Sequence, residues 1–233
     1  MAVDFVPQGV YEDIINLLGQ WKVMDMKSLK EMCSYDVQYY NLLHKVRKLE
    51  NHGLVKGILL GKKNKHIFLT NKGLQYTPYD KTYEICDENI THDVIVGKVL
   101  KELLRLESFF NGKMFHQIIS DKILPDAEIE GQKDGECYRL ALEIELTQKS
   151  QDRVKGKYRQ YARGNVFNYG LFITNKMTLF KAYKKYLEEM KSEIQESIIL
   201  LYDRKLTEIN FDYQSSECFY MGQMTSFKEL FGD

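Results

Sequence analysis

The sequence predicts an α/β (α+β) chain built from two domains, a helical one that ends in a β-hairpin and a larger one with a mixed sheet. The 233 residues, of which 44% are hydrophobic, are enough for one large core or two small ones. Apolar residues recur at helical spacing in the first 51 residues and then alternate at strand spacing. Beyond residue 90 the two periods follow one another, which is typical of a sheet covered by helices.

The composition excludes several classes of protein. Charged residues make up 28% of the chain and there are 3 Pro, which argues against disorder. No apolar run approaches the roughly 20 residues of a membrane span, and the first residues do not resemble a secretory signal. The 4 Cys are scattered without a CxxC pair, which disfavours a zinc site or a disulfide framework. We therefore expect free thiols, a cytoplasmic protein and no membrane partner.

The net charge of zero hides two basic segments. Residues 41–75 carry eight Lys or Arg against one Glu, and residues 151–163 carry five against one Asp. Acidic residues gather instead in 120–145 and 188–196. A neutral total rules out an overall basic coat, but local basic patches keep nucleic acid among the candidate partners.

Three helices are predicted near the N-terminus, over 10–20, 26–33 and about 37–51, with Ser34 or Asp36 as N-cap of the third. Gly53 follows the third helix and suits a left-handed C-terminal cap. The residues of this helix predicted to face the core are Tyr40, Leu43, Val46 and Leu49. Those predicted to lie away from that stripe are Tyr39, Asn41, Lys45 and Lys48.

Two strand-like runs follow, 54–60 and 66–70, joined by the Lys-rich segment 61–65. Three helices followed by a basic hairpin predict a winged helix-turn-helix over residues 1–78. The segments LENHGLVKG and IFLTNKGLQY resemble winged-helix regulators of the MarR-like kind. Such a fold places the third helix in the major groove and the hairpin Lys residues on phosphates, although winged helices also serve as protein-docking modules. The predicted DNA-binding residues here are Tyr39, Asn41, Lys45, Lys48, Lys62, Lys63 and Lys65.

The second domain is predicted over residues 91–233, after a linker at 79–90 that lacks a clean period. A helix is expected over 91–107, with Thr91 as its N-cap. Its predicted apolar stripe consists of Val94, Ile95, Val99, Leu103 and Leu106.

The stretch 123–150 carries the candidate chemistry. It predicts a strand, a turn at 133–135 and a second strand, in which Glu143 and Glu145 share one face because strand side chains alternate. Asp126 on the neighbouring strand would complete a cluster of three acids. A hard divalent cation, raised pKa values or basic side chains must then neutralise it. The alternative is that both glutamates face water beside Lys149.

A helix over 151–163 follows and places Arg153, Lys157 and Tyr161 on one face. A strand over 165–174, a helix through residues 177–194 and a strand over 197–203 complete the predicted order. This order of helices and strands indicates an α/β domain with a mixed sheet.

The motif Pro125-Asp126 followed by Glu143-x-Glu145 resembles that of the PD-(D/E)xK nuclease fold. The Lys of the family motif is replaced here by Glu145, so Lys157 or Lys149 would have to supply the positive charge. The longer pattern, which runs from His92 through these residues to Lys157-x-x-x-Tyr161, is similar to the plasmid replication-relaxation family. It also resembles the small MobC-type mobilisation relaxases. This resemblance covers most of the chain.

The resemblance implies a metal-dependent enzyme that nicks DNA at a plasmid transfer origin, with relaxosome or coupling proteins as further partners. Asp126 and Glu143 would hold Mg²⁺ or Mn²⁺, and Glu145 would be a third ligand or would orient the attacking water. Lys157 or Lys149 would stabilise charge on the phosphate, and such a site can hydrolyse a phosphodiester. His92 would belong to the site or simply cap a helix. Arg153 and Arg159 would hold the DNA backbone.

Alternatives remain open from the residues alone. Tyr158 and Tyr161 allow a covalent phosphotyrosine intermediate or, more commonly, simple core packing. Glu107 is either an additional metal ligand or a solvated side chain. The whole chain is otherwise a non-catalytic DNA-binding protein, or an endonuclease of restriction or transposon-end type. The sequence leaves the DNA target and the oligomeric state open.

Overall fold

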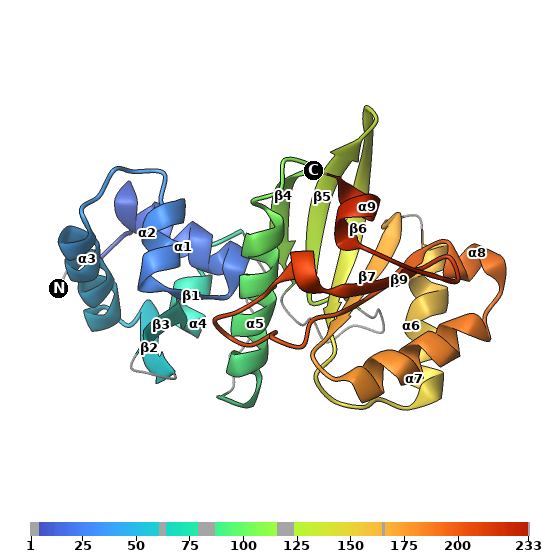
Figure 1. Ribbon diagram of the computed structural model, residues 1–233. Coiled ribbons are helices and arrows are strands. Elements are labelled where there is room, and N and C mark those ends of the chain that lie inside the picture. Colours follow the sequence, from blue (N-terminus) through green and yellow to red (C-terminus); the bar gives the residue numbers. More distant parts are fainter. Residues whose placement is uncertain (1–4, 61–63, 79–86, 116–123, 165, 233) are drawn as a thin grey trace. The chain divides into compact units, whose positions relative to one another are not determined.

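The computed structural model describes residues 5–60, 64–78, 87–115, 124–164 and 166–232. The chain divides into two compact units, and the boundary between Gly97 and Lys98 falls inside helix α5 (Asp87–Leu103). Figure 1 shows the helices and strands of both units. Among the described residues, no helix combines the length and the apolar character that crossing a membrane requires. The described cysteines, Cys33, Cys137 and Cys218, are free thiols.

The first unit is a winged helix, as predicted. Three helices precede a hairpin whose strands, together with one short earlier strand, form an antiparallel sheet in the order β1-β3-β2. The short strand was not predicted, because three residues are too few to show an alternating pattern. The elements are α1 (Val10–Trp21), β1 (Val23–Asp25), α2 (Met26–Met32), α3 (Tyr39–Asn51), β2 (Val55–Leu60), β3 (Asn64–Leu69) and α4 (Asn71–Leu74).

The buried face of α3 differs from the predicted one. Leu42, Val46 and Leu49 are fully buried, whereas Tyr40 is 69% exposed and Leu43 is only partly buried. A constant spacing of three residues drifts by about 60° per step around an α-helix, so four such residues cannot stay on one face. The observed spacing of four and three residues does stay on one face.

The prediction for the start of α3 is wrong, whereas the prediction for its end is confirmed. The N-cap is Gln38, without a side-chain cap, while the Ser34 amide and hydroxyl both donate to Asp13; the capping role predicted for Ser34 or Asp36 is wrong. At the other end, Gly53 adopts φ +67° as predicted. The Gly53 and Leu54 amides then donate to carbonyls of the last helical turn, which satisfies them.

Helix α5 begins four residues earlier than predicted, so Thr91 lies inside it and is not its N-cap. Of the predicted linker, residues 79–86 lie outside the described residues, and residues 87–90 are helical. Ile90 and Val94 pack with Val23 and Phe68 of the winged-helix sheet, which explains why the helix starts early. The predicted stripe, Val94, Ile95, Val99, Leu103 and Leu106, is buried.

The second unit contains a seven-stranded mixed sheet, in the order β10-β9-β8-β7-β6-β5-β4. Strands β6, β7 and β8 are parallel and the outer pairs are antiparallel. This confirms the predicted α/β (α+β) class. The strands are β4 (Phe109–Met114), β5 (Ala127–Lys133), β6 (Glu136–Ile144), β7 (Tyr169–Thr174), β8 (Ile198–Tyr202), β9 (Glu217–Tyr220) and β10 (Gln223–Thr225). The helices are α6 (Gln151–Arg163), α7 (Met177–Glu188), α8 (Ser192–Gln195) and α9 (Phe227–Phe231), with a 3₁₀ turn at Tyr213–Ser215.

Helices cover both faces of this sheet. On one face, side chains of α6, α7 and α8 share a core with inward-facing residues of β6 to β9, among them Ala141, Phe172 and Leu200. On the other face, Phe231 of α9 contacts Phe109 and Tyr138. The face under α6 is the one that carries the candidate site.

Candidate active site

The β5–β6 hairpin brings Asp126 beside Glu143. Its two-residue turn, Asp134-Gly135, has positive φ at both positions and sets a register in which Ala127 faces Leu142. Asp126 stands just before β5, where its amide donates to the Leu142 carbonyl at 3.0 Å. Its carboxylate oxygen Oδ2 in turn accepts from the Ile144 amide at 2.8 Å. The start of β5 and the end of β6 therefore hold two carboxylates together.

Glu143 and Glu145 are buried, with exposed fractions of 1% and 4%. Both lie under α6, whose Val154, Tyr158 and Tyr161 pack on the same face of the sheet. The alternative in which these glutamates face water beside Lys149 is therefore wrong. The Lys149 ammonium instead bonds the Thr147 hydroxyl at 3.1 Å.

Helix α6 supplies the groups that neutralise the buried acids. Ser150 caps its N-terminus as the acceptor for the Arg153 amide. Lys157 Nζ lies 2.5 Å from Glu143 Oε2 and 3.3 Å from Glu145 Oε1. The Tyr161 hydroxyl, one turn further on, donates to Glu143 Oε1. Arg153 was predicted on the same face but is exposed, because the buried face of this helix passes through Val154 instead.

The electrostatics of the cluster centre on Glu143. Burial, and then the negative charge of Asp126, raise the pKa of Glu143 from 4.5 to about 7, although Lys157 and Tyr161 act in the opposite direction. Burial alone would lower the pKa of Lys157, but the charges of Glu143 and Glu145 outweigh burial and raise it. The ammonium therefore stays charged at neutral pH, while Glu143 titrates there.

The donor atoms at this point are those that a hard cation prefers. Asp126 and Glu143 present carboxylate oxygens close to each other, and Mg²⁺ is usually held by one or two carboxylates together with water and substrate phosphates. Within the described residues, no group of three or more His, Cys, Asp or Glu side chains is arranged to hold a metal ion. Asp126 and Glu143 are therefore the two carboxylates of this cluster that could hold such a cation. Glu145, predicted as a third ligand, faces Lys157.

Three other candidate residues, His92, Glu107 and Tyr158, are accounted for by their own surroundings. His92 belongs to the first unit, where its Nδ1 is 3.9 Å from Asp93 Oδ1. Glu107 follows α5 and is exposed, as a solvated side chain is expected to be. Tyr158 is fully buried, with its hydroxyl donating to the Tyr183 carbonyl at 3.3 Å, so core packing accounts for it.

Sequence reasoning missed Tyr183 on α7. Its ring is buried, and burial together with the negative charge of Glu145 raises the pKa of its hydroxyl. This Tyr lies 38 residues beyond Glu145 in the sequence. No local pattern connects the two positions, because only the packing of α7 against α6 brings them together.

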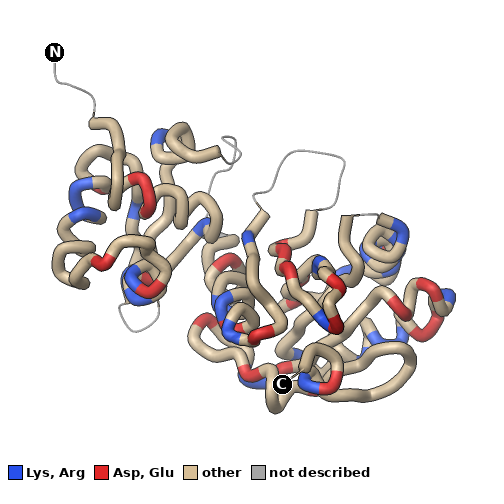
Figure 2. Tube along the Cα trace, turned by 90° about the horizontal axis from the view of Figure 1, so that it is seen from above, with Lys and Arg blue, Asp and Glu red and all other residues tan. Residues whose placement is uncertain are grey.

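The predicted DNA-binding residues are not equally available. Tyr39, Asn41, Lys48, Arg153 and Arg159 are exposed. Lys45 is partly buried, with its ammonium 4.7 Å from the centre of the Tyr11 ring. Lys65 forms an ion pair with Glu50 at 2.7 Å. Lys62 and Lys63 lie outside the described residues. Charges of both signs are spread over both units, as Figure 2 shows.

Comparisons with known proteins find a distant likeness to solved structures only. No protein-family model matches it, and no curated protein matches it. Among solved structures, the restriction endonuclease FokI has 11% sequence identity and a TM-score of 0.25, over 79% of this chain and 41% of that one. FokI bound to DNA has 11% identity and a TM-score of 0.23, over 69% and 36%. This chain therefore spans less than half the length of these structures.

Proposed function

We propose that the second unit is a Mg²⁺- or Mn²⁺-dependent DNA endonuclease that nicks one strand at a plasmid transfer origin in the cytoplasm. The observation that carries the proposal is the buried cluster in which Lys157 Nζ lies between Glu143 and Glu145, with Asp126 beside Glu143. Buried charges of this kind, with a carboxyl pKa shifted to about 7, are concentrated at functional sites. An assay of DNA cleavage distinguishes such a site from a purely structural ion-pair network.

Each residue of the cluster has a role in the proposal. Asp126 and Glu143 would hold the divalent cation, which would supply a lowered pKa of the attacking water and offset the phosphate charge. Lys157 donates to a phosphate oxygen and stabilises the charge that develops there. Glu145 accepts from Lys157 and keeps its ammonium in place, which is how this chain can do without a Lys at the Glu145 position. Tyr161 fixes the Glu143 carboxylate through Oε1.

The first unit would select the DNA. The exposed face of α3 carries Tyr39, Asn41 and Lys48, the side-chain types that reach base edges and phosphates from a helix in the major groove. Arg153 and Arg159, exposed on α6, would contact the DNA backbone close to the acid cluster. Relaxosome or coupling proteins are proposed as partners only from the sequence resemblance.

A plasmid nicking assay tests the proposal. Supercoiled DNA with the plasmid's own origin is incubated with the protein and Mg²⁺ or Mn²⁺, and with EDTA as a control. We expect open circles that disappear with EDTA and with Glu143→Ala. The matched control is Glu107→Ala, which removes an exposed glutamate and should cut normally. Retarded but uncut origin DNA under both metals would refute the nuclease function.

A second candidate function is that of a non-catalytic DNA-binding protein, a replication or relaxosome accessory factor or a repressor. One observation favours it: the Lys157 ammonium already neutralises the buried carboxylates, so the cluster is satisfied without a metal ion. Calorimetric titration with MgCl₂ separates the two candidates. Binding that is lost in Glu143→Gln supports the enzyme, and no binding with or without origin DNA supports the accessory factor.

A further inference from the structure

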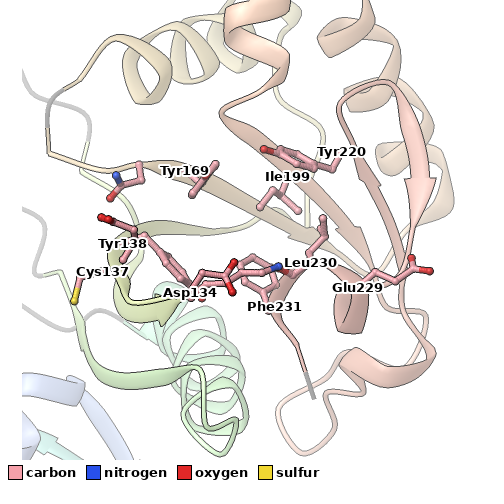
Figure 3. A pocket seen from close by; sticks show the side chains of 12 residues that line it. Asp134, Cys137, Tyr138, Tyr169, Ile199, Tyr220, Glu229, Leu230 and Phe231 are labelled. Carbon is pink, nitrogen blue, oxygen red and sulfur yellow. The ribbon is translucent and has the colours of Figure 1, made fainter.

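The second unit has a cavity on the face of its sheet opposite the acid cluster. Tyr138 and Glu143 are five residues apart on β6, so their side chains point to opposite faces. The cavity has a volume of about 490 Å³ and opens between β6, β7, β8, β9 and α9. The main side chains around it are Tyr138, Tyr169, Ile199, Tyr220, Leu230 and Phe231, shown in Figure 3. Its volume falls within the range of small-molecule sites.

Aromatic rings from three strands and one helix meet around this cavity. The ring centres of Tyr138 and Tyr169 are 6.3 Å apart, and those of Tyr169 and Tyr220 are 6.4 Å apart, both pairs edge to face. The Phe231 ring lies 6.2 Å from that of Tyr138. Gly131 lets the Tyr138 ring lie across β5, because a Cβ there would come within 2.6 Å of it. The rings are thus held by the sheet before any ligand arrives.

Tyr138 and Tyr220, two of the tyrosines around the cavity, stay neutral at physiological pH. Burial raises the pKa of Tyr138 and of Tyr220 to about 12. The Tyr220 hydroxyl donates to the Glu196 carbonyl at 2.9 Å, which fixes its ring. The Tyr138 hydroxyl is buried and makes no hydrogen bond among the described residues. The neighbouring Ser108 hydroxyl offsets a small part of the rise in the pKa of Tyr138. The rings therefore offer π-electrons and apolar surface rather than charge.

The charged side chains of the lining are mostly acidic. Lys133 is the one basic residue of the described lining, and its ammonium is held by the Leu230 carbonyl at 2.7 Å. Glu229 accepts from Ser226 and Thr225 and caps α9. Asp134 and Glu136 are exposed and form no ion pair with any described residue. With three acidic side chains against one Lys in the described lining, the charge around the cavity would repel phosphates and attract cations.

We propose that this cavity binds a small organic cation whose charge is spread over methyl groups, such as a quaternary ammonium compound. Aromatic rings attract such cations through their negative faces, and the carboxylates of the lining add a long-range attraction. The apolar side chains of Ile199 and Leu230 in the lining suit methyl groups better than a hydrated ion. This site is on the other face of the sheet from the proposed nuclease centre and does not depend on it.

Methyl NMR of the whole protein tests the proposal. The Ile199 δ1-methyl group, labelled with ¹³C and assigned with Ile199→Val, is followed while choline is added. We expect a saturable shift of this signal. The neutral isostere 3,3-dimethylbutan-1-ol, which has carbon in place of the charged nitrogen, should bind at least fivefold more weakly. Equal binding of both compounds, or no shift with choline, overturns the proposal.

Variants connect the signal to the cavity. Tyr169→Leu should weaken choline binding at least fivefold, and Glu136→Gln, which changes an exposed side chain and leaves the fold intact, should weaken it about twofold. The matched control is Tyr40→Leu, which removes an exposed tyrosine from the first unit and should bind choline as the unaltered protein does. Unchanged binding in both cavity variants places the cation elsewhere and overturns the assignment.

Discussion

Lys157 and Glu143 form a buried ion pair in which Nζ lies 2.5 Å from Oε2, with Glu145 Oε1 at 3.3 Å from the same nitrogen. The three side chains carry one positive and two negative formal charges, and Asp126 adds to the negative side. A buried pair of this kind is a poor source of net stability, because desolvation offsets the attraction. Loss of one member, however, leaves the other charged and unpaired. A variant that lacks only the Lys157 ammonium should therefore be less stable than the unaltered protein.

Lys157→Met should destabilise the protein by about 3–5 kcal/mol at pH 7, because it leaves two buried carboxylates without their counter-charge. It should also abolish nicking. Denaturant unfolding at pH 7 and pH 5 measures the loss of stability. This loss should be smaller at pH 5, because Glu143 is protonated there. Lys149→Met is the matched control, since that ammonium bonds a Thr hydroxyl, and its stability should change by less than about 0.5 kcal/mol. A similar loss in both variants would contradict the ion-pair account.

The stability of the metal-free protein should fall as pH rises from about 4.5 to about 7, because of Glu143. Its pKa is raised from 4.5 in the unfolded chain to about 7 in the folded one, so the folded state holds the extra proton in this window. The contribution is fully present below pH 4.5 and is lost by pH 7, with an order of magnitude of ~3 kcal/mol. Unfolding free energies at pH 5, 6 and 7 measure the slope. Glu143→Gln cannot titrate, and its curve should be flatter by this amount; parallel curves would contradict the assignment.

Mg²⁺ should stabilise the folded protein and release a proton near neutral pH. Only the ionised form of Glu143 binds a cation well, so metal and proton compete for it. At 100 times the dissociation constant, the gain is about 2.7 kcal/mol. Thermal unfolding with and without MgCl₂, and calorimetry in buffers of different ionisation enthalpy, give the two quantities. Glu143→Gln and Asp126→Asn should each lose most of the gain, and Glu107→Gln should keep it.

Lys48→Ala should weaken DNA binding for every sequence. The slope of log K against log salt concentration should also become smaller by about 1, because one phosphate contact is lost. Asn41→Ala should instead reduce the preference for origin DNA over unrelated DNA. Gel-shift titrations at several salt concentrations distinguish these effects. Lys65→Ala serves as control, because its ammonium is paired with Glu50 and its loss should leave the salt slope nearly unchanged.

Two glycines should respond to alanine in opposite directions. Gly53 has φ +67° at the end of α3, a conformation that costs an L-residue about 1 kcal/mol. Gly156 lies inside α6, and a Cβ there would meet no atom within 4 Å, so alanine should stabilise the helix by about 0.5–1 kcal/mol. Chemical denaturation measures both. Loss of nicking in Gly156→Ala would show that α6 needs flexibility at this point.

Local chemistry in the sequence determined much of this protein. The bounds of α6 follow from its apolar period and from Ser150, and the β5–β6 hairpin follows from Asp134-Gly135 and strand alternation. Both are properties of neighbouring residues, which a single sequence contains. The same reasoning placed Asp126 near Glu143, because a tight turn sets the register of the strands that it joins.

Only the tertiary structure decided which side chains were buried together. It turned Glu145 and Lys157 toward each other, brought Tyr183 beside them, and placed Leu42 rather than Tyr40 in the core. It also added β9, β10 and α9, whose short segments show no clear period, and with them the aromatic cavity. These outcomes depend on packing between segments far apart in the chain. The energies of these contacts depend on burial and on pairs of charges, and a local pattern of residues predicts neither.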